Sequence, residues 1–405
     1  MRKYLISLDK VTLIPYFEIV AKLFSFITVI ILVSILSIED YGHYSFTISL
    51  VMMLSVIMDG GINNLIFNYS LYDRLNKIAL FFVVRNYLSF FSIMIFIVCI
   101  YFFNENLIIN IIFYSITTYF ISTIAFFKMI VRGQGNSSLD LLTIIIEPFF
   151  RFIILLIFWL LKVDLNIEIV FVLLLGVSFF SFLVVYRFVI PTYDIRSNTS
   201  KKEINFLNIL NESIYYLLYY LALIFIMRSE IFYISNKLGI DSVAYYSSAL
   251  NIYFAIQLFF RSLINSKMKK IMNENRTSKL NSIKRLCFIV TATVFIIIIF
   301  SQLIFSIIYP ISYFEYNFLL QYIIIGLPFY VMTNMGIQYF YIKFQTQNNF
   351  LILSVTALLK LILFLSIEFD NLVHFAYSFI AFEIFLGVLY FIFVLNKLYR
   401  IKPNI

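Results

Sequence analysis

Long apolar segments alternate with short polar segments along all 405 residues of the chain. Each apolar segment runs for about 17–25 residues, the length that an α-helix needs to cross about 30 Å of hydrocarbon. Strands of a membrane barrel would be about half as long and would alternate apolar and polar positions. The pattern therefore predicts an all-α integral membrane protein. Its twelve predicted spans are about 12–36, 43–68, 78–102, 107–129, 139–161, 167–190, 207–236, 242–264, 286–309, 316–342, 350–367 and 371–395.

Composition agrees with this class, because the chain is 62% hydrophobic and only 13% charged, with a mean hydropathy of +0.97. A water-soluble fold could not bury so much apolar surface. Asp9, Lys10, Glu18 and Lys22 interrupt the first apolar segment, and no small-residue cleavage site follows it. We therefore expect this segment to stay attached as the first helix.

The distribution of Lys and Arg supports an even number of spans. If the N-terminus is cytoplasmic, most of the 30 basic residues fall on inner segments, and the outer loops carry only Lys162 and Lys237. One missed or one added helix would disturb this alternation from that point onwards. We therefore expect both termini to be cytoplasmic. The net charge of +9 then follows from the inner loops and needs no nucleic-acid partner.

The chain also carries a weak internal repeat. The stretch "SIEDYGHYSF" at 37–46 resembles "GIDSVAYYSS" at 239–248, about half a chain length further on. Chance similarity is the alternative in a chain this rich in Ile, Tyr and Ser. If the repeat is real, both stretches mark the external turn between the first and second helix of each half.

The most polar interior stretch, 191–205, is the expected seam between the halves. It divides the chain into an N-terminal six-helix bundle at 1–195, a cytoplasmic linker at 196–206 and a C-terminal six-helix bundle at 207–405. Because six is an even number, both bundles enter the membrane from the same side. Parallel repeats of this kind are expected to surround a central cavity.

Several kinds of chemistry are missing from the sequence. The stretch "GQGNSS" at 133–138 lacks the Gly-Lys-Ser/Thr ending of a phosphate-binding loop. The two histidines, His43 and His374, are far apart, and Cys99 and Cys287 lie scattered in apolar segments. We therefore expect no catalytic residues, no metal site and no cofactor. This profile is typical of a secondary transporter and not of an enzyme.

Charged residues inside the predicted spans are the main candidates for function. Such charges cost about 2.5–3.5 kcal/mol on insertion scales, and they usually face a water-filled interior. Six are basic and six are acidic: Lys22, Arg85, Arg151, Arg228, Arg261 and Lys360, and Glu18, Asp59, Glu147, Glu212, Glu230 and Glu383.

Spacing divides these charges into pairs and single groups. Glu18 with Lys22, and Glu147 with Arg151, are four residues apart and can meet on one helix face. Such pairing alone could serve to make membrane insertion tolerable. Arg228 and Glu230 are two apart and do not share a face. For the charges near the inner ends, Arg85, Arg261 and Glu212, extension to the membrane interface is the competing interpretation.

Two prolines predict irregular helices. Pro148 follows Glu147 in the fifth span, and Pro328 lies just after Gly326 in the tenth. Each proline removes a backbone hydrogen bond and frees a carbonyl group. These kinks could be hinges for alternating access or static bends.

The N-terminal part of the chain carries recognisable motifs. The stretch "LIPYFEIVAKLFSFITVIILVSILSIEDYGHYSF" at 13–46 contains Asp40, Tyr41, Gly42 and Tyr44, and "MDGGINNLIFNYS" at 58–70 contains Asp59 and Gly61. With twelve helices in two halves, this pattern resembles the Wzx-type O-antigen flippases of the multidrug, oligosaccharidyl-lipid and polysaccharide (MOP) exporter superfamily.

The resemblance implies a carrier in the bacterial inner membrane that serves lipopolysaccharide biosynthesis. Such a carrier moves undecaprenyl-diphosphate-linked O-antigen repeat units from the cytoplasmic to the periplasmic leaflet, by alternating access coupled to H⁺ or Na⁺. Membrane lipid, a polysaccharide polymerase and a chain-length regulator would be its other partners. Related carriers line their cavity with Arg and Lys. The even balance of acids and bases here argues against a strongly cationic cavity.

Under this hypothesis the charged residues take two roles. The proposed substrate-binding residues are Arg151, Arg228, Lys360, Lys22, Arg85 and Arg261, and the proposed ion-coupling residues are Asp59, Glu147 and Glu383. Charge-assisted hydrogen bonds from the basic groups would hold the diphosphate.

Two other functions remain open. An O-antigen polymerase is a polytopic glycosyltransferase of similar size, but its family is characterised by a long periplasmic loop, whereas every predicted outer loop here is short. A small-molecule exporter of the same superfamily would keep the fold and change the cargo.

Overall fold

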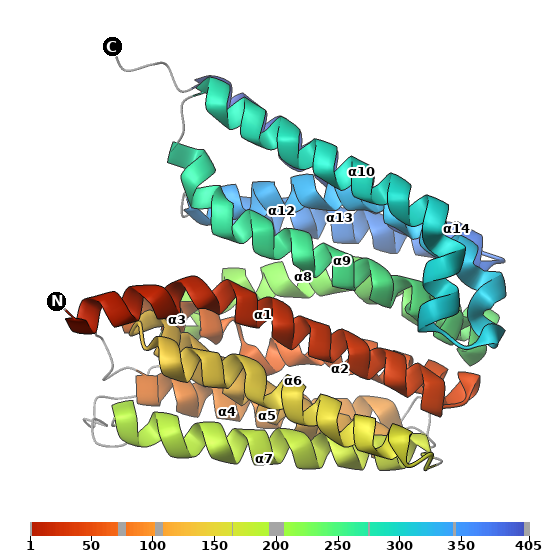
Figure 1. The fold of residues 1–405 in the computed structure, drawn as a ribbon, viewed down its shortest axis with the longest axis horizontal. Helices are drawn as coiled ribbons and strands as arrows, with labels where there is room; N and C mark the ends of the chain where they lie inside the picture. Colours follow the sequence, from red (N-terminus) through yellow and green to blue (C-terminus); the bar gives the residue numbers. More distant parts are fainter. Residues whose placement is uncertain are drawn as a thin grey trace. The chain divides into compact units, whose positions relative to one another are not determined.

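The computed structural model describes residues 2–71, 78–101, 108–163, 165–193, 206–273, 276–342 and 346–400, and all regular elements in these ranges are helices (Figure 1). In these ranges, twelve helices are long and apolar enough to cross a membrane, which confirms the prediction. The helices are α1 (Arg2–Ile35), α2 (Ile38–Asp59), α3 (Ile62–Leu71), α4 (Ile78–Tyr101), α5 (Ile108–Gly133), α6 (Ser137–Leu160), α7 (Ile167–Tyr193), α8 (Phe206–Leu238), α9 (Ile240–Asn273), α10 (Arg276–Ile308), η3 (Ile311–Tyr316), α11 (Asn317–Ile323), η4 (Ile324–Gly326), α12 (Leu327–Ile342), α13 (Thr346–Ser366) and α14 (Leu372–Arg400).

The chain divides into two compact units, Met1–Ile224 and Phe225–Ile405. Their boundary falls inside α8, so the first half of this helix belongs to the first unit. Most of the predicted linker at 196–206 lies outside the described residues, and its role as a seam stays a prediction.

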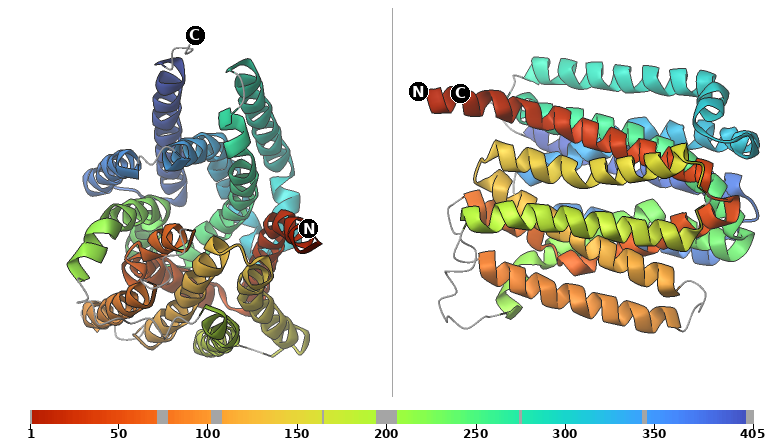
Figure 2. Two further views of the ribbon diagram at one scale, coloured as in Figure 1. Left: turned by 90° about the vertical axis from the view of Figure 1, so that its left-hand side faces the viewer. Right: turned by 60° about the horizontal axis from the view of Figure 1, so that its bottom comes forward.

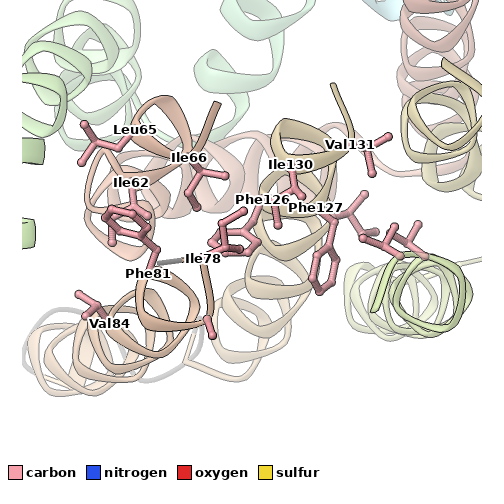
Figure 3. Close-up of a cluster of buried hydrophobic side chains, with 14 of the residues drawn as sticks. Ile62, Leu65, Ile66, Ile78, Phe81, Val84, Phe126, Phe127, Ile130 and Val131 are labelled. Atoms are coloured by element: carbon pink, nitrogen blue, oxygen red, sulfur yellow. The ribbon is translucent and has the colours of Figure 1, made fainter. Parts of the chain in front are cut away.

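The first unit is built around α5. This helix packs against α2, α3, α6 and α7, and α1 lies along α6 (Figures 1 and 2). Apolar side chains from α3, α4 and α5 form a buried cluster that includes Ile66, Phe81, Phe126 and Ile130 (Figure 3). The cluster fixes the position of α3 against its neighbours.

The second unit is built around α12, which packs against both α14 and α9. Its helix α10 exposes large apolar side chains, among them Phe288, Ile299 and Ile307. An apolar surface of this kind on a membrane-spanning helix matches contact with lipid.

The two similar stretches lie at equivalent places, each starting in the short turn between two long helices and continuing into the second of them. α2 begins at Ile38, because the Ser37 hydroxyl accepts a hydrogen bond of 3.1 Å from the Asp40 backbone N–H and acidic residues in the first turn suit the helix dipole. α9 begins at Ile240, directly after Gly239. Both stretches therefore form the first turns of the second long helix of each predicted half.

Two predicted spans are interrupted. The expected helix at 43–68 ends at Asp59, because Gly60 and Gly61 adopt left-handed conformations, with φ of +59° and +72°. α3 then begins at Ile62 as a separate helix. The predicted kink at Pro328 is present as the single 3-10 turn η4, in which the Ile324 carbonyl accepts from the Leu327 N–H instead of from position 328.

The basic segment at 265–285, which lies between two predicted spans, is helical over most of its length. α9 continues to Asn273 and α10 begins at Arg276. The segment contains no Gly or Pro, and its five Lys and two Met favour helices.

Candidate functional site

A cluster of buried charges lies in the second unit and is made by Glu230 of α8, Lys360 of α13 and Glu383 of α14. We call it the C-terminal charge cluster. Glu230 and Lys360 are 0% exposed and Glu383 is 5% exposed. The three residues are far apart in the sequence, and only the packing of three helices brings them together.

Lys360 is the centre of this cluster. Its ammonium group forms an ion pair with Glu230 and donates a hydrogen bond to the Ile226 carbonyl. The rings of Phe364 and Phe382 lie 5.7 and 5.6 Å from Nζ. These contacts stabilise the ammonium group, because a buried charge without partners would have a high desolvation cost.

Glu383 has no such close partner. The Tyr253 hydroxyl from α9 lies beside its carboxyl group without the geometry of a good hydrogen bond. The turn η4 packs closely against it, since a Cβ atom added at Gly326 would lie 3.3 Å from the Glu383 Cβ. The predicted irregular segment of the tenth span is therefore part of this site.

In the first unit, Glu147 and Arg151 form the ion pair that their spacing predicted. The pair lies on α6 next to Tyr44 of α2 and Tyr114 of α5, both of which interact electrostatically with Arg151. The Arg151 Nε is buried and has no hydrogen-bond partner. Its guanidinium group thus keeps one unused donor beside two tyrosines.

Arg85 is completely buried and does not extend to the membrane interface, which corrects the competing interpretation for this residue. It donates a hydrogen bond of 3.0 Å to Thr123 and interacts with the charge of Asp59. Asp59 ends α2, and the Asn63 backbone N–H hydrogen-bonds to it from the start of α3. Arg85 lies on α4, which packs against α2 and α5, and this packing encloses its side chain.

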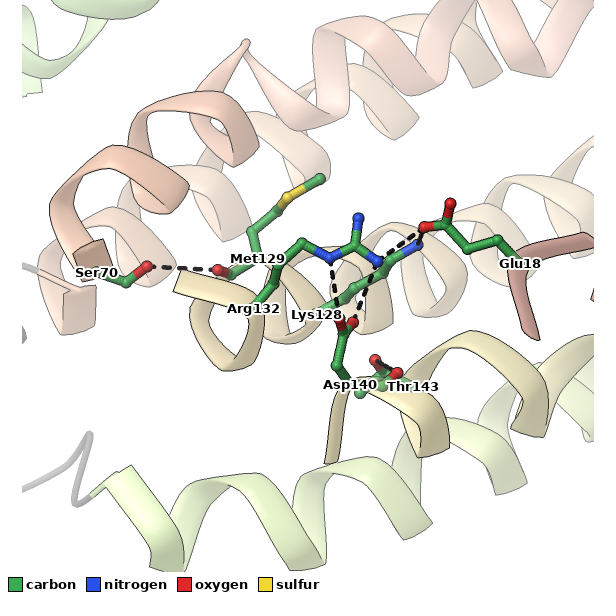
Figure 4. Close-up of polar contacts among 7 residues, drawn as sticks. All are labelled: Glu18, Ser70, Lys128, Met129, Arg132, Asp140 and Thr143. Atoms are coloured by element: carbon green, nitrogen blue, oxygen red, sulfur yellow. Dashed lines mark hydrogen bonds and ion pairs between the residues drawn. The ribbon is translucent and has the colours of Figure 1, made fainter. Parts of the chain in front are cut away.

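A second network joins α1, α5 and α6 (Figure 4). Arg132 donates to Glu18 at 2.8 Å and to both carboxylate oxygens of Asp140, at 3.0 and 3.3 Å. Lys128 lies 3.5 Å from Glu18. Glu18 of α1 is thus held by two basic side chains of α5, a contact between helices that the spacing along α1 does not predict.

Asp140→Asn is expected to lower the free energy of unfolding by about 1.5–3 kcal/mol, the usual contribution of a hydrogen bond to a charged group. The Asp140 side chain is 1% exposed, so water cannot replace it as the partner of Arg132. Thermal unfolding of the purified protein in detergent measures the change. Glu39→Gln is the control, because Glu39 is largely exposed and its pair with His43 spans 3.9 Å; a loss of equal size there would contradict the prediction.

The remaining proposed substrate-binding residues are more accessible. Arg228 is partly buried, with its guanidinium carbon 4.6 Å from the centre of the Phe254 ring. Arg261 and Lys22 are exposed. Arg228 contacts Phe254 and Glu230 pairs with Lys360, and Arg228 also acts electrostatically on Glu230.

Sequence analysis missed three parts of these sites. The contacts of Arg132 and Lys128 with acidic side chains were not predicted from the sequence, and neither was the part played by Asp140. Glu230 was noted, but its pairing with Lys360 was not foreseen. No spacing rule links residues on separate helices, and the only signal available was that Glu230 and Lys360 are charges deep within apolar spans.

Several solved structures share this fold. A multidrug resistance MATE family transporter of the MOP superfamily, in an inward-facing conformation, is 14% identical with a TM-score of 0.66, and the match covers 95% of this chain and 96% of that one. A MOP superfamily transporter from Pyrococcus furiosus is 12% identical with a TM-score of 0.64, covering 98% and 96%. The lipid II flippase MurJ, in an inward closed conformation, is 15% identical with a TM-score of 0.70, covering 95% and 87%.

These identities show a shared fold and no more. No curated protein matches the sequence significantly. A family model described as polysaccharide biosynthesis protein matches residues 7–267, which is more than half of the chain, and the protein therefore belongs to this family.

Proposed function

We propose that the protein is a flippase for undecaprenyl-diphosphate-linked oligosaccharides, specifically O-antigen repeat units used in lipopolysaccharide biosynthesis. The observation that carries the proposal is the combination of a polysaccharide biosynthesis family with the fold of membrane transporters. One structure with this fold is a lipid II flippase. The cargo moves from the cytoplasmic to the periplasmic leaflet of the bacterial inner membrane, with both termini of the protein in the cytoplasm.

A protein is needed for this step because the sugar headgroup cannot cross hydrocarbon by itself. Each hydroxyl group that enters without a hydrogen bond costs about 2–7 kcal/mol. A polar path through the protein would shelter the headgroup, while the lipid tail stays in the bilayer. Alternating access would open this path to one leaflet at a time.

The residues proposed to bind the diphosphate differ in how available they are. Arg151, Arg228, Arg261 and Lys22 keep exposed surface or an unused donor, and these are the preferred ligands. Arg85 and Lys360 are fully enclosed. The last two would bind the diphosphate only after leaving their present partners.

Among the proposed ion-coupling residues, the charges favour Glu383. Glu147 is neutralised by its pair with Arg151, and Asp59 lies near Arg85. Glu383 also interacts with Lys360, but Lys360 already forms an ion pair with Glu230. A carboxyl group without its own counter-charge is the best placed to take up an H⁺ or Na⁺ ion.

Deletion of the gene tests the proposal. We expect single lipid-linked repeat units to accumulate on the cytoplasmic leaflet, where an impermeant sugar-modifying reagent does not reach them in intact cells. Reintroducing the wild-type gene should restore polymer export, and Ala variants of Arg151, Arg228 and Arg261 should restore it less well. Full restoration by all three variants would contradict the assignment of the ligands.

The same experiment separates the alternatives. Repeat units that reach the periplasmic leaflet but stay unpolymerised would indicate a polymerase instead of a flippase. The likeness to a multidrug transporter favours a small-molecule exporter as the second candidate. In that case deletion would leave lipid-linked intermediates unchanged. A polysaccharide polymerase and a chain-length regulator are the proposed partners downstream.

A further inference from the structure

The C-terminal charge cluster has an unequal number of acidic and basic side chains. Two carboxyl groups, Glu230 and Glu383, surround one ammonium group, Lys360, and all three are almost completely removed from solvent. If all three groups were ionised, one negative charge would lack a counter-charge within the cluster, although Arg228 also acts on Glu230 from the same helix. Such a charge is costly, by several kcal/mol, and buried groups usually avoid the cost by binding a proton or another cation.

The contacts identify which carboxyl group carries the excess. Glu230 has an ion pair with Lys360, whose ammonium group also donates to the Ile226 carbonyl. Glu383 interacts with Lys360 only through space, and the Tyr253 hydroxyl is a polar neighbour of its carboxyl group. Glu383 is therefore the group whose charge is least compensated.

The ionisable groups that face Glu383 come from four helices. They are Lys360 of α13, Glu230 of α8, Tyr253 of α9 and Tyr330 of α12. Lys360 is the basic group that acts on Glu383 directly, and Arg261 of α9 acts on the neighbouring Tyr330. A metal cation at Glu383 would need several oxygen ligands and additional space in this packed region, whereas a proton on Glu383 makes the cluster neutral without adding volume.

We propose that Glu383 is the site at which the transporter binds and releases one proton per cycle, with Lys360 as the permanent counter-ion of Glu230. The packed arrangement seen here then requires the proton on Glu383. Loss of the proton leaves a net negative charge that favours a conformation in which water reaches the cluster. The coupling ion of the proposed flippase is thus H⁺ and not Na⁺, an inference that rests on ion-coupled transport.

Infrared difference spectroscopy of the purified full-length protein in lipid nanodiscs tests the proposal directly. Spectra taken between acidic and alkaline buffer should contain the carbonyl stretch of one buried, protonated carboxyl group. Glu383→Gln should abolish this band, and replacing choline chloride by sodium chloride at constant pH should leave it unchanged. Glu368→Gln is the control, because Glu368 is 88% exposed and should not affect the band.

Two results would overturn the proposal: a band that persists in Glu383→Gln, or a band that sodium chloride removes at constant pH. Glu383→Gln resembles the protonated form in shape and charge, so we expect it to fold; size-exclusion chromatography checks this. The band does not depend on cargo. The infrared band could behave as expected while repeat units still reach the periplasmic leaflet in cells that lack the gene. In that case the proton site is supported and the flippase proposal is contradicted.

Discussion

Lys360→Met is expected to lower the free energy of unfolding by about 3–5 kcal/mol, the usual effect of removing one partner from a buried ion pair. Met retains an unbranched chain of similar length, so the substitution mainly removes the charge. Glu230 would then be a buried carboxylate without its ion-pair partner, with only the weaker effect of Arg228 left and a second carboxyl group nearby at Glu383. Thermal or denaturant-induced unfolding in detergent measures the loss.

A double variant separates charge from packing. Adding Glu230→Gln to Lys360→Met removes the uncompensated carboxylate, so the double variant should regain most of the lost stability. Lys237→Met on α8 is the matched control, since Lys237 and Glu368 are both largely exposed and 4.0 Å apart. Its effect should stay within about 0.5 kcal/mol. If the double variant were as unstable as Lys360→Met alone, side-chain packing and not charge would explain the loss.

Gly61→Ala should lower the free energy of unfolding by about 2–5 kcal/mol, from two causes. Gly61 has a φ of +72°, a left-handed conformation that costs about 1–2 kcal/mol for a residue with a Cβ atom. The added Cβ would also lie 2.7 Å from the Ser213 carbonyl oxygen and 2.8 Å from the Leu217 backbone nitrogen. Backbone atoms of α8 cannot move aside as a flexible side chain can, and overpacking costs about 1–3 kcal/mol.

Gly135→Ala isolates the conformational part of this effect. Gly135 has a similar φ of +69°, but no atom lies within 4 Å of an added Cβ. We expect its loss to be about 1–2 kcal/mol, and clearly smaller than that of Gly61→Ala. Equal losses at the two glycines, measured by thermal unfolding in detergent, would show that the contact with α8 contributes nothing.

The membrane class and the number of helices follow from the sequence because they depend on local properties. A stretch of about 20 apolar residues forms a helix in lipid whatever its neighbours are, since every backbone group must find its partner within the segment. The pair Glu147 and Arg151 was predictable for the same reason, because helix geometry alone brings together residues four apart. The sequence also identified Lys360 and Glu383 as unusual, since charges are rare in apolar spans.

Interruptions of the helices were only partly predictable. Pro328 predicts an irregular helix in the sequence itself, because proline has no backbone N–H group to donate. The interruption after Asp59 was missed: glycines are tolerated within membrane helices, so Gly60 and Gly61 do not by themselves indicate left-handed conformations. The close approach of α8 to Gly61 explains why no side chain is present there, and only the packed structure reveals it.

By itself, the sequence determined that this chain is a bundle of twelve apolar helices with a few charges inside, because hydrophobic length and helix periodicity act within one segment. Tertiary structure alone decided which charges meet. It joined Lys360 to Glu230 and Arg132 to Asp140 and Glu18, and it enclosed Arg85. The reason is physical: a charge in a dry interior takes whatever opposite charge the packing of helices brings within reach, and that distance is not encoded in any spacing along the chain.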